Sequence, residues 1–114
     1  MGPSISCWLT TPLAYDWPVD FEWDHAKNLS NQRKHGLSFA EVQRLFQGGV
    51  DVLEIFDVEH SDSEDRFIAI GPIDRGLVVV VYTEPEEDVV RIIGARFATK
   101  RERTLYRSHM DRFK

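Results

Sequence analysis

The sequence has a single cysteine, Cys7, among its 114 residues. One cysteine cannot close an intrachain disulfide or supply a cysteine-rich zinc site, so a disulfide-stapled fold and a zinc-ribbon fold are both excluded. The longest apolar run extends only from Leu77 to Tyr82, far short of the roughly 18 residues of a membrane-spanning helix. The chain also lacks a glycine-rich nucleotide loop and a nucleophile-elbow motif, which argues against an ordinary metabolic enzyme.

The N-terminal residues lack the basic start and the continuous apolar stretch of a secretion signal, so we expect a cytoplasmic protein with no membrane association. Residues 1–18 contain Pro3, Pro12 and Pro18 and are predicted to form an irregular arm. Residues 19–114 are predicted to form one domain, because this length suffices for one modest core but not for two.

The overall net charge of −5 conceals an asymmetry along the chain. Residues 91–114 contain eight Lys or Arg against two acidic residues, a net charge of +6, whereas residues 51–88 contain twelve acidic residues against two arginines, a net charge of −10. A net acidic protein with one basic edge favours a local anion site over general coating of nucleic acid. A solvated helix face balanced by an acidic loop is the alternative interpretation.

Local signals predict a short strand and two helices in the first half of the chain. Asp24 is a suitable N-cap and Gly36 a suitable left-handed C-cap for the first helix. Ser38 and Glu41 have the spacing of a capping box that begins the second helix. The predicted ranges are a strand over 19–23 and helices over 24–35 and 38–48.

From residue 51 onward the pattern indicates strands joined by short turns, over 52–58, 66–70, 77–83 and 89–97. Short links favour consecutive antiparallel strands, and the apolar run 77–81 is expected to be central. Thr99 and Glu102 form a second capping box, which opens a C-terminal helix. The inner face of this helix is predicted to hold Leu105, Tyr106, His109, Met110 and Phe113.

The predicted fold class is therefore α+β, with two N-terminal helices, an antiparallel sheet of about four to five strands and a C-terminal helix.

Arg91 and Arg96 lie on the last predicted strand, and the C-terminal helix begins directly after Arg96. Arginines at the end of a sheet, beside a helix N-terminus, are suited to binding phosphate. In a regular strand these two side chains point to opposite faces, so sharing one phosphate would require a bulge or twist near Gly94. Surface ion pairs with carboxylates are the alternative interpretation of both arginines.

A set of ordered motifs resembles the BrnT family, the ribonuclease toxins of type II toxin–antitoxin systems. The motifs extend from Phe21 to Tyr106 and are Phe21-x-Trp23-Asp24-x-x-Lys27, Asn31-x-x-Lys34-His35-Gly36-x-Ser38-Phe39, Asp57-x-x-His60-Ser61-x-x-Glu64-x-Arg66-Phe67, Gly71, Tyr82-Thr83, Arg91-Ile92-Ile93-x-Ala95-Arg96-x-Ala98 and Glu102-Arg103-x-x-Tyr106. Each fragment is weak alone, but their order and spacing over one small domain are specific.

The resemblance implies a fold similar to RelE and an endoribonuclease that cleaves messenger RNA and arrests translation without a metal or other cofactor. It also implies a partner antitoxin similar to BrnA, with operator DNA bound only through the toxin–antitoxin complex. The alternative is a catalytically silent, toxin-like binding module that holds the antitoxin and acts as a transcriptional co-repressor.

For such a nuclease, Arg96, Arg91 and Arg66 are the candidates for stabilising phosphate charge, and His60 with Glu64 for proton transfer. Histidine titrates near neutral pH and suits either an acid or a base role. A histidine that fixes a turn, and a Glu64 that only orients Arg66, are the structural alternatives. A metal site of Asp57, His60 and Glu64 is disfavoured, because one histidine with two flexible acids is a weak ligand set.

The candidate RNA-binding residues are Lys27, Lys34, Tyr82, Arg103 and Arg107. Lys34 also suits the negative end of the first helix without any RNA. Tyr82 either stacks on a base or belongs to the core. Tyr106 is expected to be structural, with a catalytic hydroxyl as the alternative.

Overall fold

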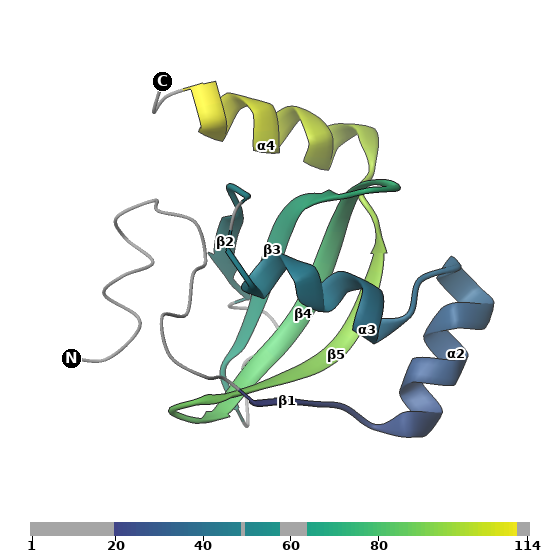
Figure 1. The fold of residues 1–114 in the computed structure, drawn as a ribbon. Helices are drawn as coiled ribbons and strands as arrows, with labels where there is room; N and C mark the ends of the chain where they lie inside the picture. The colour runs from purple at the N-terminus through teal and green to yellow at the C-terminus, as the bar shows by residue number, and fades with distance from the viewer. Residues whose placement is uncertain (1–19, 49, 58–63, 112–114) are drawn as a thin grey trace.

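A five-stranded sheet with helices on both faces forms the described part of the chain, residues 20–48, 50–57 and 64–111 of a computed structural model (Figure 1). The strand order is β1-β5-β4-β3-β2. The strands are β1 (Asp20–Glu22), β2 (Leu53–Phe56), β3 (Arg66–Ile73), β4 (Gly76–Glu86) and β5 (Val89–Phe97), and the helices are α2 (His25–His35), α3 (Phe39–Val42), the 3-10 helix η1 (Gln43–Phe46) and α4 (Lys100–Asp111). The α+β class is confirmed, and the predicted arm, residues 1–18, lies outside the described residues.

Strands β2 to β5 pair consecutively and antiparallel, as predicted, and β4 is the central strand. The sheet is nevertheless mixed, because β1 pairs parallel with β5, from Asp20 opposite Val89 to Glu22 opposite Arg91. No hairpin joins these two strands, so nothing forces them to be antiparallel. β3 and β4 also extend further than predicted, because pairing across the hairpin continues through Pro72 opposite Leu77.

The helix boundaries follow the predicted caps. Asp24 Oδ1 accepts from the Lys27 backbone N–H at 3.1 Å, and Gly36 ends α2 with a φ of 71°, a value that favours glycine. Ser38 Oγ accepts from the Glu41 backbone N–H at 3.1 Å. The second predicted helix is shorter as an α-helix than expected, because it continues as η1.

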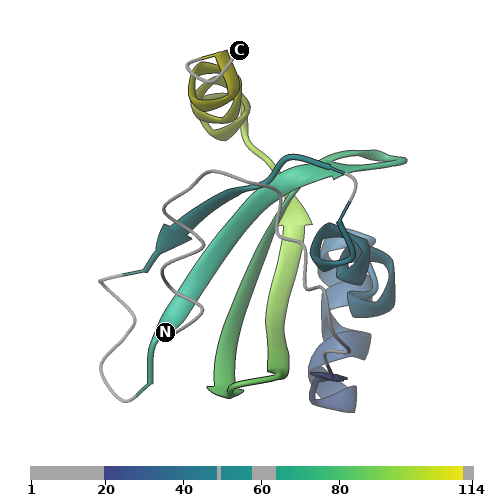
Figure 2. The ribbon, with the colours of Figure 1, turned by 60° about the vertical axis from the view of Figure 1, so that its left-hand side comes forward.

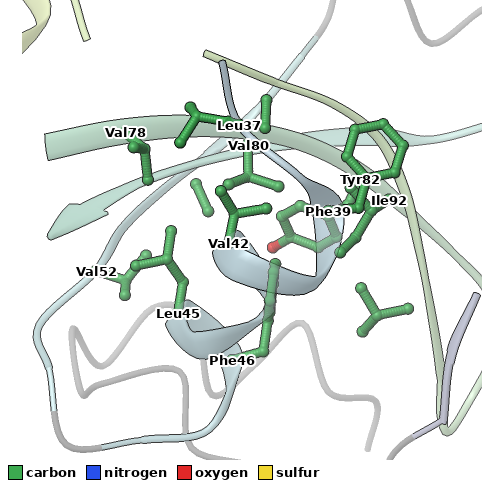
Figure 3. Close-up of a cluster of buried hydrophobic side chains, with 13 residues drawn as sticks. Leu37, Phe39, Val42, Leu45, Phe46, Val52, Val78, Val80, Tyr82 and Ile92 are labelled. Atoms are coloured by element: carbon green, nitrogen blue, oxygen red, sulfur yellow. The ribbon is translucent and has the colours of Figure 1, made fainter. Parts of the chain in front are cut away.

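The main core lies between α3, η1 and one face of the sheet (Figure 3). Phe39 and Phe46 from this helical segment pack there with Val80, Tyr82 and Ile92 from the strands. The rings of Phe46 and Tyr82 meet edge to face with centroids 4.8 Å apart. Complete burial of these aromatic and aliphatic side chains anchors the helical layer to this face.

Helix α4 lies at one end of the opposite face, away from α2 and α3 (Figure 2). Its Tyr106 and Met110 pack against a second cluster that includes Ile70 and Val79, and the Tyr106 hydroxyl donates to the Asp51 carbonyl at 2.7 Å. The predicted inner face of α4 is confirmed at Tyr106 and Met110. The prediction is wrong at Leu105, whose side chain is exposed (47%). Phe113 lies outside the described residues.

Candidate nucleic-acid interface

A bulge in β5 sets the directions of the two arginines on that strand. Tyr82 is opposite Ile92 and Val81 is opposite Gly94, so Ile93 is the extra residue. Because one inserted residue reverses the alternation of side chains, Arg91 opposite Thr83 and Arg96 opposite Val79 belong to the same face. This is the face on which α4 packs. The sequence predicted that the two arginines can share a face only with a bulge near Gly94, and the structure has that bulge.

The strip of β5 between the two arginines is open. Gly94 lies between them on the same face, and a Cβ atom added there would meet no atom within 4 Å. The opposing residues Thr83 and Val79 are four positions apart on β4, which corresponds to roughly 13 Å along a strand. This separation suits contacts to neighbouring phosphates of one strand better than two contacts to a single phosphate.

Arg96 is held by a carboxylate at the start of α4. Its Nη1 and Nη2 atoms each donate to one oxygen of Glu102 at 2.7 Å, while 41% of the Arg96 side chain stays exposed. The hydrogen bonds from Arg96, together with one from the Thr99 backbone N–H, lower the pKa of Glu102 to about 2. The same bond raises the pKa of Arg96, so the guanidinium is a permanent cation at this site.

Arg91 is held from the other side, by β1. Its Nε donates to Glu22 Oε2 at 2.6 Å, and its Nη1 is 4.0 Å from Glu64 Oε2. Arg66 belongs to the same row of the sheet, because Thr83 is opposite both Arg66 and Arg91. The structure thus brings Arg66, Arg91 and Glu64 together at the end of the face that α4 leaves uncovered.

The two interpretations of the arginines, a phosphate site and surface ion pairs, are each consistent with part of the structure. Arg91 and Arg96 form carboxylate pairs, as the alternative required, and the partners come from β1 and α4 with one longer contact to Glu64. Both side chains also remain more than 40% exposed on an open face. Exposed ion pairs contribute only about 0–1 kcal/mol, so such pairing does not prevent an anion from binding beside them.

His60, the predicted proton-transfer residue, lies outside the described residues. Within the described ranges, no group of three or more His, Cys, Asp or Glu side chains is arranged to hold a metal ion. None of the helices in these ranges is both long and apolar enough to cross a membrane.

A basic pocket of about 200 Å³ lies where α2 meets the edge of β5. Lys27, Lys34 and His35 line it together with the bulged Ile93. Buried Asn31 forms its inner wall and joins the two elements, accepting from the Ala95 backbone N–H at 3.1 Å and donating to the Leu37 carbonyl at 2.9 Å. The lysines predicted to bind RNA thus share one pocket, and Asn31 on the same stripe is a structural link.

The remaining candidates for RNA binding differ in how exposed their side chains are and in whether they already have hydrogen-bond partners. Arg107 is exposed on α4 and pairs with no acid in the described ranges, whereas Arg103 Nη1 donates to the Ala98 carbonyl at 2.9 Å. Tyr82 is fully buried, with Phe46 and Phe67 against its ring. Its ring is therefore not accessible to an RNA base. The prediction that Tyr82 binds RNA is wrong, and the alternative, a core residue, is confirmed.

Sequence reasoning found the Glu102 capping box, with Thr99 Oγ1 accepting from the Glu102 N–H at 3.2 Å, but missed the bond of Glu102 to Arg96. Glu22 was missed altogether. Only its position on β1, beside Arg91, makes its carboxylate relevant, and no local sequence signal predicts a parallel pairing across nearly 70 residues.

Comparisons with known proteins identify the family and the fold of the chain. Residues 23–102 match the family model described as the ribonuclease toxin, BrnT, of type II toxin–antitoxin systems. The crystal structure of the Brucella abortus ribonuclease toxin BrnT is similar, with a TM-score of 0.54 and 25% sequence identity, and the match covers 72% of this chain and 99% of that one. No curated protein sequence matches the chain.

Proposed function

The chain belongs to the BrnT family of type II toxin–antitoxin ribonuclease toxins, and from this membership we propose that it cleaves messenger RNA and thereby arrests translation. The observation that carries the proposal is the β5 bulge, which gives Arg91 and Arg96 a common open face. Cations directed at one surface from a rigid strand are what a phosphodiester substrate requires.

In the proposed reaction the ribose 2′-hydroxyl attacks the adjacent phosphorus. The bond from phosphorus to the 5′-oxygen of the next nucleotide breaks, and the products are a 2′,3′-cyclic phosphate and a 5′-hydroxyl. Negative charge accumulates on the non-bridging oxygens in the transition state, where the fixed guanidinium of Arg96 stabilises it. Arg91 and Arg66 lie on the same face, opposite Thr83, which is four positions along β4 from the partner of Arg96, and they hold another phosphate of the same strand.

Two protons move in this reaction, from the attacking hydroxyl and to the leaving oxygen. We assign proton transfer to His60, on the evidence of the sequence, with Glu64 as its partner. Glu64 lies 4.0 Å from Arg91, which connects the proposed proton-transfer pair with the proposed phosphate site. Side chains supply every charge and proton in this scheme, so it requires no metal.

The proposed RNA path continues on both sides of β5. Lys27 and Lys34 line the pocket at the edge of the strand, and Arg103 and Arg107 extend along α4. Cations spaced in this way contact the phosphate backbone without reading its sequence.

A toxin of a type II system acts with an antitoxin, and we propose a partner similar to BrnA that neutralises this chain and brings operator DNA into the complex. A messenger RNA substrate also implies a cytoplasmic location. The pairing of both arginines with carboxylates favours a second candidate, a silent module that only binds the antitoxin. Expression without an antitoxin separates the two, because only a nuclease should arrest growth.

The direct test is cleavage of RNA by purified, antitoxin-free protein. We expect Arg96→Ala and His60→Ala each to lower the cleavage rate by about 10²-fold, as the loss of one charge-stabilising or proton-transfer group does. Gly94→Leu should also inhibit, because it fills the open strip without touching the core.

The matched control is Arg44→Ala. Arg44 belongs to η1, on the face of the sheet opposite to α4, and its Nη1 atom is paired with Asp74 Oδ2 at 3.1 Å. The Arg44→Ala variant should cleave like wild type. Equal activity in the wild type, Arg96→Ala and His60→Ala would refute the site, and an inactive wild type that arrests no growth would favour the silent module.

A further inference from the structure

We propose that Glu102 is a positioning residue for RNA cleavage, whose carboxylate binds one edge of the Arg96 guanidinium and turns the other edge toward the scissile phosphate. The inference rests on the proposed function, and it assigns a role in that same site to a side chain for which the sequence predicted only a helix-capping role.

The donors of Arg96 divide into two groups. Nη1 and Nη2 each give one N–H to Glu102 at 2.7 Å, and Nη1 also makes a longer contact of 3.4 Å to the Phe97 carbonyl. The Nε–H and the second Nη2–H have no acceptor among the described residues. These two donors lie side by side on one edge of the planar group, and such an edge matches two oxygens of a phosphate.

Glu102 is itself fixed by the first turn of α4. Its Oε1 accepts from the Thr99 backbone N–H at 2.8 Å, and its own backbone N–H donates to Thr99 Oγ1 at 3.2 Å. The side chain of Glu102 is also less exposed than that of Arg96, at 24% against 41%. The bond from the Thr99 backbone N–H, which alanine at position 99 would also make, therefore orients the carboxylate, and the carboxylate orients the guanidinium.

This arrangement has a consequence for catalysis. An arginine side chain has many rotamers, and fixing them when RNA binds costs free energy. A guanidinium already locked in one orientation avoids that cost and stabilises charge as it forms in the transition state. Arg91 is held differently, through its Nε, so the two arginines present different edges to the RNA.

The test uses two variants, one that weakens the bond of Glu102 to Arg96 and one that removes only the hydroxyl cap of α4. Glu102→Gln keeps an oxygen that caps α4 but replaces the other acceptor by an amide group, which cannot accept from Arg96. Thr99→Ala removes the hydroxyl cap and leaves the Arg96–Glu102 pair intact. A merely structural role predicts that both variants lose activity in proportion to their loss of stability.

The measurements are kcat and KM for a short RNA oligonucleotide and the melting temperature of each full-length variant, with wild type and Arg96→Ala alongside. We expect Glu102→Gln to lower kcat by about 10- to 100-fold, the size of effect that misplacing a catalytic group causes, with KM within about threefold of wild type. Thr99→Ala should melt several degrees lower, about 4–8 °C for each kcal/mol lost, and retain wild-type kcat.

Each result distinguishes the hypotheses. An active wild type with an impaired Arg96→Ala variant and a fully active Glu102→Gln variant would refute positioning while leaving the proposed function intact. Equal losses of kcat in Glu102→Gln and Thr99→Ala would also refute it. If the wild type itself does not cleave RNA, the proposed function and this inference fail together.

Discussion

At the scale of single residues, Glu102 links the stability of the fold to pH. Its pKa in the folded protein is lowered to about 2, first by the hydrogen bonds from Arg96 and then by the bond from the Thr99 backbone. A carboxylate whose folded pKa lies below its unfolded value stabilises the fold above the unfolded pKa, and this contribution is lost as the pH falls toward the folded pKa. Glu102 should therefore stabilise the protein at pH 6 and lose most of this contribution near pH 2.

We predict that Glu102→Gln lowers the free energy of unfolding at pH 6 by about 1–2 kcal/mol, less than the full pKa shift corresponds to, because solvent screens this partly exposed pair. Urea unfolding at pH 6 and at pH 2.5 measures the difference. The difference between the variant and wild type should be much smaller at the lower pH, because Glu102 is protonated in the unfolded chain there and the pH approaches its folded pKa of about 2. A difference that stays constant between the two pH values would show that the pair with Arg96 is not its origin.

Pairing with a carboxylate does not by itself remove an arginine from phosphate chemistry. A guanidinium has five N–H donors and two edges suited to bidentate contacts. Glu102 occupies one edge of Arg96, and Glu22 binds a single donor of Arg91. Each arginine keeps donors for an anion, and each carboxylate restricts the orientations in which those donors are presented.

At the scale of elements, the helix ends were predictable because caps are local. Asp24, Gly36, Ser38 and Thr99 each act within a few residues of their own position. The existence and order of four strands followed from hydrophobic patterning in the same way. The parallel pairing of β1 depends on contacts between distant segments, and no local pattern contains that information.

The candidate site was predictable to the same degree. The residue types were identifiable, and the need for a bulge between Arg91 and Arg96 followed from strand geometry alone. Whether the bulge exists depends on how β4 and β5 pair. The role of Tyr82 could not be predicted from the sequence, because a tyrosine in an apolar strand can either stack on a base or belong to the core. The contacts of its ring with Phe46 and Phe67 show that it belongs to the core.

Asn31 connects two elements, and its removal gives a further prediction. Its side chain satisfies the backbone N–H of Ala95 at the edge of β5, where β1 has ended, and the carbonyl of Leu37. Asn31→Ala would leave both buried groups without partners, and each costs roughly 1–3 kcal/mol. We expect a loss of about 2–4 kcal/mol of unfolding free energy in urea.

The control is Gln32→Ala, an exposed polar change on the same helix, which should stay within about 0.5 kcal/mol of wild type. If the two variants unfold alike, Asn31 does not join α2 to β5 in solution. A selective loss would identify this link as what holds the pocket of Lys27 and Lys34 against the sheet.

At the scale of the whole molecule, the charge distribution constrains how RNA can bind. The chain is net acidic, so its overall charge repels RNA, and we expect RNA to bind locally at the cations around β5, α4 and the pocket on α2. Each phosphate that a cation neutralises releases counterions, and for a single strand the logarithm of the binding constant falls with the logarithm of salt concentration by about 0.7 per phosphate contact.

If most of the six cations Lys27, Lys34, Arg91, Arg96, Arg103 and Arg107 engage RNA, binding of a 2′-deoxy oligonucleotide, which cannot be cleaved by 2′-hydroxyl attack, should show a slope of about −3 to −4. Lys34→Ala and Arg107→Ala should each make the slope shallower by about 0.7, because each removes one contact. Arg44→Ala, in η1 on the other layer, should leave it unchanged. Fluorescence anisotropy between 50 and 300 mM salt, about the range where such slopes are resolved, measures all four proteins. A wild-type slope near zero, or an equal change in Arg44→Ala, would mean that the basic path around β5 is not where RNA binds.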